Sequence, residues 1–185
     1  MKKNTQKILA IVIILALIII IFLVIFFQGN KGIIEGISAK SLNLNLNDLP
    51  DEYKEFTNDS INQGLLMLYE PRESYRVIFF LGNTSNMSRT IDSFIVIFNS
   101  TDESIDFFNF STNFFKGPAV EEAKNILGDE SYGIKIMDNE KNTVGYTNCF
   151  RISNIVAAVS YIYDDYPYAF DLSKIVEQRI YDNMK

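Results

Sequence analysis

Tyrosine and aspartate residues gather near the C-terminal end of the chain, at Tyr163, Asp164, Asp165, Tyr166 and Tyr168. Aromatic rings can stack on sugars, and carboxylates attract basic groups, so one interpretation is a rim that holds a ligand or a basic partner. The other interpretation is a strand that runs into a turn, with two tyrosines packed inward. We favour the second interpretation and keep the five residues as the candidate ligand or partner rim.

The chain contains no histidine and a single cysteine, Cys149. Without histidine, neither a Ser-His-Asp triad nor a Cys–His pair can form, and one cysteine cannot make a zinc site of the usual kind. Cys149 lies within a predicted strand, so we expect a small buried core residue. Residues 138–142 resemble the start of a calcium loop, but Thr143 stands where that loop needs glycine, so a polar hairpin turn is favoured.

The familiar glycine-rich nucleotide loops are also absent from the sequence. We therefore expect a protein that is not an enzyme, with no catalytic residue, no cofactor and no metal. A carboxylate-based cell-wall or glycan hydrolase stays open as the weakest alternative, because two carboxylates can perform that chemistry without histidine.

Acceptor motifs for N-glycosylation, Asn-x-Ser/Thr, are the remaining chemical signal. They occur at Asn58, Asn83, Asn86, Asn99 and Asn109. Asn83 and Asn86 fall in a polar stretch, 82–88, which predicts a loop, so we expect these two to be the glycosylation sites if the protein is a glycoprotein.

An apolar block, residues 8–27, stands at the start of the chain. All of its residues are Ile, Leu, Val or Phe except Ala10 and Ala16. A helix of this length spans about 30 Å, which matches the hydrocarbon core of a bilayer. No small-residue cleavage pattern follows, so we expect a retained single-pass anchor that contacts the lipid bilayer.

Charge predicts the orientation of this anchor. Three lysines and no acids lie in residues 1–7, which predicts a cytoplasmic tail and an outer domain at the cell membrane. The remainder carries 14 basic (17 − 3) and 23 acidic residues, a net charge of −9, so a nucleic-acid partner is not expected. The anchor lacks a small-x-x-x-small face, which favours a plain tether over a helix-pairing segment.

The elements of the outer domain follow from its periodicity. Residues 28–40 contain three glycines and predict a flexible stalk before a domain over 41–185. Ser100 and Glu103 have the spacing of a capping box, and Asp171 is expected to begin the last helix. The expected strands are 42–46, 65–69, 76–81, 91–98, 131–137, 143–152 and 155–163, with a short helical turn near Glu55 and helices after Ser100, over 119–127 and from Asp171. This order predicts an α+β fold in which a two-layer antiparallel sheet has its helices packed on one face.

A family resemblance rests on short motifs in this order, which include Asp48-Leu49-Pro50, the Ser100–Phe108 helix start, residues 128–133, Phe150–Ile162 and residues 174–180. Over residues 42–182 the chain resembles archaeal and bacterial membrane-anchored extracytoplasmic domains that are uncharacterised. It resembles more distantly the PsbP-like domains and the mycobacterial sensor-type lipoprotein domains. The resemblance implies a curved antiparallel sheet used for binding and implies no site residue.

Together these observations predict a membrane-tethered extracytoplasmic binding module that is not catalytic, with a surface ligand that the sequence does not identify. The first alternative is an accessory subunit of a membrane protein complex, in which a membrane protein is the partner. In this alternative the anchor helix makes the contacts with the partner.

Overall fold

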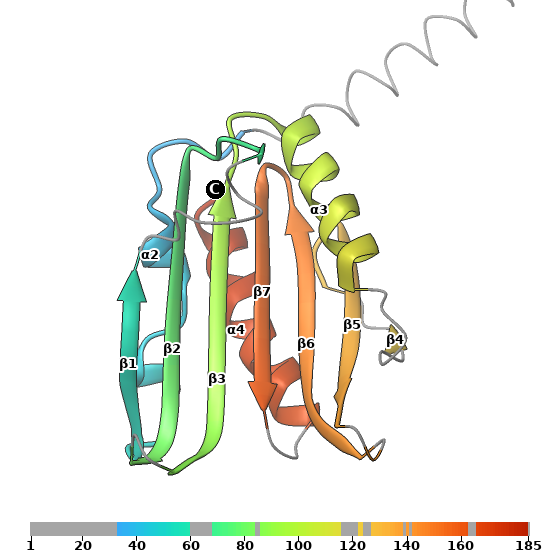
Figure 1. Cartoon of the computed structure of the whole chain (residues 1–185). Helices are drawn as coiled ribbons and strands as arrows, with labels where there is room; N and C mark the ends of the chain where they lie inside the picture. The colour runs from blue at the N-terminus through green and yellow to red at the C-terminus, as the bar shows by residue number, and fades with distance from the viewer. Residues whose placement is uncertain are drawn as a thin grey trace, which may run out of the picture. The chain divides into compact units, whose positions relative to one another are not determined.

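Within the described part of the chain, seven antiparallel strands form one sheet in the order β1-β2-β3-β7-β6-β5-β4 (Figure 1). The computed structural model describes residues 33–59, 68–83, 86–115, 122–123, 127–138, 140, 142–162 and 166–184. The strands are β1 (Tyr53–Asp59), β2 (Glu73–Asn83), β3 (Asn86–Ile97), β4 (Glu122–Ala123), β5 (Glu130–Met137), β6 (Thr143–Ile152) and β7 (Ile155–Ile162). The α+β class is therefore confirmed.

Helices cover both faces of this sheet. They are α2 (Ala39–Leu42), the 3-10 turn η1 (Leu46–Asp48), α3 (Thr101–Phe115) and α4 (Tyr166–Asp182). In Figure 1, α2 and α4 lie behind the sheet and α3 lies in front of it. The prediction that all helices pack on one face is wrong, because the strands are apolar on both faces and each face needs a cover.

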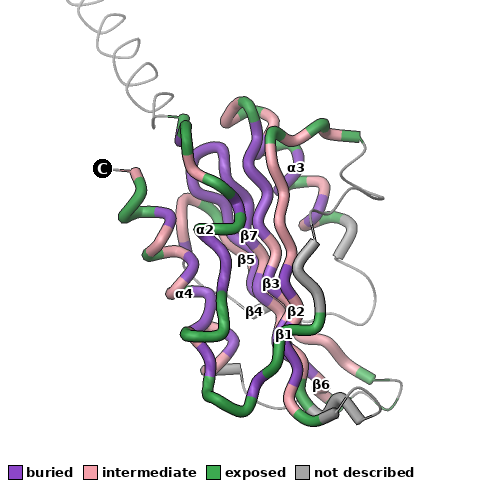
Figure 2. The backbone as a smooth tube through the Cα atoms, turned by 90° about the vertical axis from the view of Figure 1, so that its left-hand side faces the viewer, coloured by how far each residue is buried: buried purple, intermediate pink, exposed green. Residues whose placement is uncertain are grey.

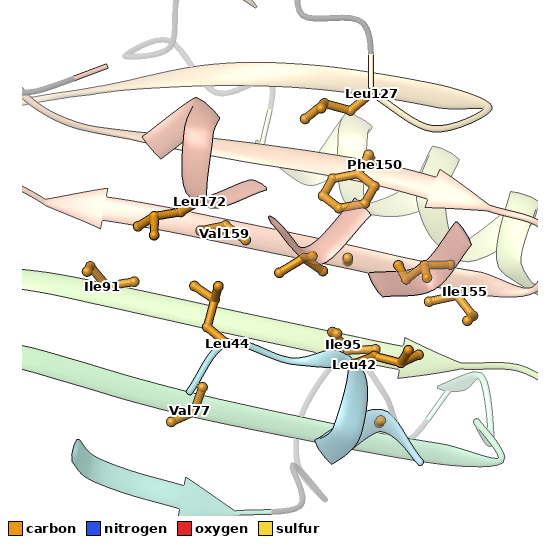
Figure 3. Packing of buried hydrophobic residues seen from close by; sticks show 14 of the residues in the cluster. Leu42, Leu44, Val77, Ile91, Ile95, Leu127, Phe150, Ile155, Val159 and Leu172 are labelled. Atoms are coloured by element: carbon orange, nitrogen blue, oxygen red, sulfur yellow. The ribbon is translucent and has the colours of Figure 1, made fainter. Parts of the chain in front are cut away.

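Strand alternation explains the two faces. On β3, Ile91, Ile95 and Ile97 point to the face of α2 and α4, whereas Val96, and Phe98 just after the strand, point to the face of α3. The larger core joins this first face to the two helices, with Leu42 and Leu172 packed beside strand residues such as Ile95 and Val159 (Figure 3). Figure 2 shows the buried positions concentrated on the central strands. Each large apolar side chain buried here contributes roughly 1.5–3 kcal/mol.

The helix α3 starts where the capping box predicts. The Ser100 hydroxyl accepts a hydrogen bond from the Glu103 amide at 3.2 Å, and the Glu103 carboxylate accepts one from the Asn99 amide at 3.1 Å. The second contact is shifted by one residue from the standard motif. Phe107 and Phe108 then bury against the sheet, which gives α3 its inner face.

The segment between the predicted anchor and β1 differs from expectation. Ile34 and Ala39 are buried in the main core, so residues 33–40 belong to the folded domain and not to a flexible stalk. The strand predicted over 42–46 is absent, because Leu42 ends α2 and Leu46 begins η1. Asn43 is 1% exposed and its amide group donates to the carbonyls of Tyr75 and Ser93, both at 3.1 Å. The alternating asparagines thus make local turns and buried hydrogen bonds.

Other element boundaries also differ from the predicted ones. The helical turn expected near Glu55 is strand β1, and β2 and β3 continue to Asn83 and from Asn86 through the predicted loop. Helix α4 begins at Tyr166, five residues before Asp171, since Pro167 is well tolerated in a first helical turn. Of the helix predicted over 119–127, the described residues Glu122–Ala123 form β4, and the strand predicted over 65–69 lies largely outside the described residues.

Strands β3, β5, β6 and β7 confirm the predictions for 91–98, 131–137, 143–152 and 155–163 to within a few residues at their ends. Within the described ranges, no helix is long and apolar enough to cross a membrane. The predicted anchor at 8–27 lies outside those ranges.

Candidate functional site

An open pocket of about 550 Å³ lies where β2 begins and β3 ends. We name it the entry pocket, because its wall consists of the first described residues of the chain. Three separate stretches line it: Ile33, Glu35, Gly36, Ile37 and Ser38; Arg72 and Glu73; and Asn99. Its volume falls in the range of about 300–1,000 Å³ that is usual for small-molecule sites.

Three hydrogen bonds fix the wall of the entry pocket to the sheet. The Ile34 amide donates to Oδ1 of Asn154 at 3.0 Å, and the Ile34 carbonyl accepts from Nη2 of Arg72 at 2.8 Å. The Ala39 amide donates to Oε1 of Glu73 at 2.9 Å. The wall is therefore held at both ends by side chains from distant parts of the chain.

The tight turn between β6 and β7 supports this wall from inside. Ser153 and Asn154 are fully buried, and Nδ2 of Asn154 donates to the Phe98 carbonyl at 2.8 Å. The Phe98 amide donates in return to the Asn154 carbonyl at 2.9 Å. Asn154 thus joins the pocket wall, the end of β3 and the turn in one hydrogen-bonded unit.

A second set of polar contacts holds Ser153, whose φ of +53° lies in the left-handed region. Its carbonyl accepts from Nη1 of Arg151 at 2.8 Å and from Oγ of Ser104 at 2.7 Å. Its amide donates to Oδ2 of Asp129 at 2.9 Å. Left-handed backbone costs roughly 1–2 kcal/mol for a residue with a side chain, and these bonds offset that cost.

The chemistry of the entry pocket is mixed. It combines one guanidinium group, Arg72, with two carboxylates, Glu35 and Glu73, and the amide of Asn99 beside the apolar Ile33. Such a lining can hold a polar ligand by hydrogen bonds and charge while apolar surface covers its carbon skeleton. Among the lining residues, the Ser38 hydroxyl accepts from the Ser41 amide as the cap of α2.

The predicted tyrosine rim is only partly described. Tyr163, Asp164 and Asp165 lie outside the described residues, and Tyr166 begins α4. Tyr168 packs inward, with its ring centroid 5.2 Å from that of Tyr161. Its hydroxyl is buried and has no hydrogen-bond partner within the described part of the chain, and burial raises its pKa. Tyr168 therefore follows the inward-packed interpretation.

The predicted glycosylation residues lie at the ends of paired strands. Asn83 ends β2 and Asn86 begins β3, where the two pair with each other. Their side chains lie outside the described parts. The acceptor residues Asn99 and Asn109 are both exposed.

Cys149 is a buried free thiol, and desolvation raises its pKa to about 12. This matches the expected core residue and leaves no thiolate at neutral pH. In the connection between β5 and β6, Oδ1 of Asp138 accepts hydrogen bonds from the amides of Glu140 and Asn142, both at 2.8 Å, as expected for a polar turn. These bonds lower the pKa of Asp138. No group of three or more metal-binding side chains occurs among the residues that the structure describes.

Alkaline pH is expected to destabilise the domain. Burial raises the pKa values of Tyr53, Tyr132 and Cys149, so the native state holds these protons more tightly than the unfolded state does. Their stabilisation is complete below the unfolded pKa values, about 8.5 for Cys and 10 for Tyr, and falls as the pH rises above them. Urea unfolding of residues 33–185 from about pH 8 to about pH 11, a range that includes the unfolded pKa values, measures how steeply the free energy of unfolding falls with pH. We expect Tyr132→Phe to reduce this slope and Tyr181→Phe, at an exposed position, to leave it unchanged; equal slopes in both variants would contradict the explanation.

The entry pocket was missed from the sequence because most of its wall falls in the predicted stalk. The three glycines in this segment predict a flexible linker, but Ile33, Ile34 and Ile37 in the same stretch indicate that the segment packs against a hydrophobic core. Arg72 and Glu73 fall at a predicted turn, and nothing in their spacing links them to Asn99.

Comparisons with known proteins show the fold alone. No protein-family model and no curated protein matches the sequence. Among solved structures, the extracellular domain of PknH from Mycobacterium tuberculosis is similar, with a TM-score of 0.63 and 10% sequence identity. The match covers 80% of this chain and 99% of that one. The match shows a fold shared with a mycobacterial extracellular domain, which is consistent with the predicted resemblance to extracytoplasmic domains, whereas the PsbP-like part of that resemblance is not confirmed.

Proposed function

We propose that the chain is a membrane-tethered extracytoplasmic binding module that is not an enzyme, and that its ligand occupies the entry pocket. The observation that carries the proposal is the convergence of Arg72 and Glu73 with the wall at 33–38 in a pocket of about 550 Å³. The lining supplies charged and hydrogen-bonding groups beside apolar surface, which is the usual composition of a ligand-binding pocket.

The location outside the cytoplasm rests on the predicted anchor at 8–27 and the three lysines before it. The extracellular domain of PknH gives a precedent for this fold outside a membrane. In this proposal the bilayer contacts residues 8–27 and the described domain meets its ligand in the outer compartment.

Charge reversal in the entry pocket tests the proposal. The full-length chain, tagged at its C-terminus, is isolated from its native membrane under mild solubilisation, and bound small molecules and proteins are identified by mass spectrometry. We expect Glu35→Arg to reduce the co-purified ligand by about tenfold, which corresponds to about 1.4 kcal/mol. The matched control is Glu52→Arg, which reverses an exposed carboxylate at the opposite end of the sheet, beside the start of β1.

Three outcomes distinguish the hypotheses. A small molecule lost with Glu35→Arg and kept with Glu52→Arg supports the binding module. A stoichiometric membrane protein that both variants retain supports the accessory-subunit alternative and contradicts a ligand site in the entry pocket. Recovery of the same ligand by both variants also contradicts the proposed site.

A further inference from the structure

Five glycosylation motifs occur in the sequence, and the structure separates them by their surroundings. The transferase that uses such motifs must reach both the asparagine and the hydroxyl residue two positions later. Asn58 lies in β1 opposite Val77, and Asn83 and Asn86 lie in β2 and β3 opposite each other. Strand pairing holds the backbone of these three acceptor asparagines, so the enzyme would have to separate paired strands to bind them.

Asn109 meets a different obstacle. It lies on the exposed side of α3, but the motif also needs the hydroxyl of Ser111. Ser111 is 4% exposed, and its Oγ donates to the Phe108 carbonyl at 2.8 Å. Because Asn109 and Ser111 are the ninth and eleventh residues of a 15-residue helix, access to the hydroxyl requires the last turns of α3 to unfold.

Asn99 has neither obstacle. It lies in the short connection between Ile97, the end of β3, and Thr101, the first residue of α3. Its side chain is exposed and makes no hydrogen bond to the described residues, so a bulky substituent is tolerated there. The motif hydroxyl belongs to Thr101, where the helix needs to release only its first turn.

We propose that Asn99 is an N-glycosylation site of this protein. The amide nitrogen of Asn99 attacks the first carbon of an oligosaccharide that a lipid pyrophosphate carries in the membrane. A nitrogen–carbon bond forms, the sugar–oxygen bond to the pyrophosphate breaks, the lipid pyrophosphate leaves with the electron pair, and one amide proton passes to solvent. The inference rests on the proposed location of the domain outside the cytoplasm. Because Asn99 also lines the entry pocket, the glycan stands at the pocket rim.

The test uses the full-length chain from its native membrane. Proteolysis and mass spectrometry measure the peptide that contains Asn99, in the wild type and in Thr101→Ser, Thr101→Ala and Asn109→Gln. We expect an added mass of whole sugar residues on Asn99 in the wild type, in Thr101→Ser and in Asn109→Gln, and its loss in Thr101→Ala. Thr101→Ser keeps a hydroxyl at the first helical position, so it controls for folding.

A second measurement separates this inference from the proposed function. Protease added to intact cells digests the domain only if it lies outside. If protease digests the domain and the Asn99 peptide has the mass of the unmodified polypeptide, the glycosylation site is wrong and the proposed function still stands. A domain protected from protease overturns both. If sugar is found on Asn83 or Asn86 and not on Asn99, the argument that strand pairing blocks those two motifs is wrong.

Discussion

Arg151→Met is expected to lower the free energy of unfolding of residues 33–185 by about 3–5 kcal/mol. The Arg151 side chain is 8% exposed, and its guanidinium lies 2.8 Å from Oε1 of Glu130 and 3.7 Å from Oδ2 of Asp129. Methionine fills similar volume but leaves the Asp129 carboxylate, itself 10% exposed, without its counter-charge. The lost bond to the Ser153 carbonyl adds to the cost. Urea denaturation followed by circular dichroism measures the change.

A half-exposed ion pair provides the matched control. Arg76 and Asp92 also pair across neighbouring strands, but their side chains are 43% and 26% exposed. Solvent screens such a pair, so Arg76→Met should cost less than about 1 kcal/mol. The double variant Arg151→Met with Asp129→Asn should recover part of the loss, because it removes the uncompensated charge and keeps an acceptor for the Ser153 amide. If the Arg151 and Arg76 variants lose equal free energy of unfolding, the buried ion pair does not stabilise the fold more than the half-exposed pair does.

Asn154→Ala is expected to lower the free energy of unfolding by about 2–4 kcal/mol and to release the wall of the entry pocket. The substitution removes the acceptor for the Ile34 amide and the donor to the Phe98 carbonyl, and both contacts are buried. Two unsatisfied backbone groups remain in a site with little access to water. Hydrogen exchange then measures the Ile34 amide, which should exchange faster than the change in global stability explains.

Asn148→Ala is the control for this prediction. Asn148 is also buried, at 1% exposed, and its Nδ2 donates to Oγ of Ser173 at 3.2 Å, which places it against α4 and away from the wall at 33–38. We expect loss of stability without selective exchange at Ile34. Equal exchange of Ile34 in the two variants would show that Asn154 does not hold the pocket wall.

The parts of the fold that follow from local pattern were predictable. Residues 143–152 and 155–162 carry strong β-forming residues on either side of a two-residue turn, so β6 and β7 needed no tertiary information. The capping pair Ser100 and Glu103 likewise marked the start of α3. These elements depend on contacts between residues close in the sequence.

Tertiary contacts decided the rest. The leucine–asparagine alternation at 42–47 predicts a strand, but Asn43 is buried because it bonds the carbonyls of Tyr75 and Ser93, which lie 32 and 50 residues away. The placement of α3 on the second face depends on which strand face Phe107 and Phe108 meet, and periodicity within one helix does not determine that. The entry pocket joins three stretches for the same reason, and no local pattern connects them.

Photo-crosslinking from the entry pocket tests the binding claim most directly. A photoreactive phenylalanine analogue replaces Ile33, which lines the pocket and is 48% exposed, in the full-length chain in its native membrane. The control replaces Leu46, which is 44% exposed and lies in η1, outside the pocket lining. We expect a discrete covalent adduct from position 33 and none from position 46. No adduct at position 33, or the same adducts at both positions, would contradict a ligand site in the entry pocket.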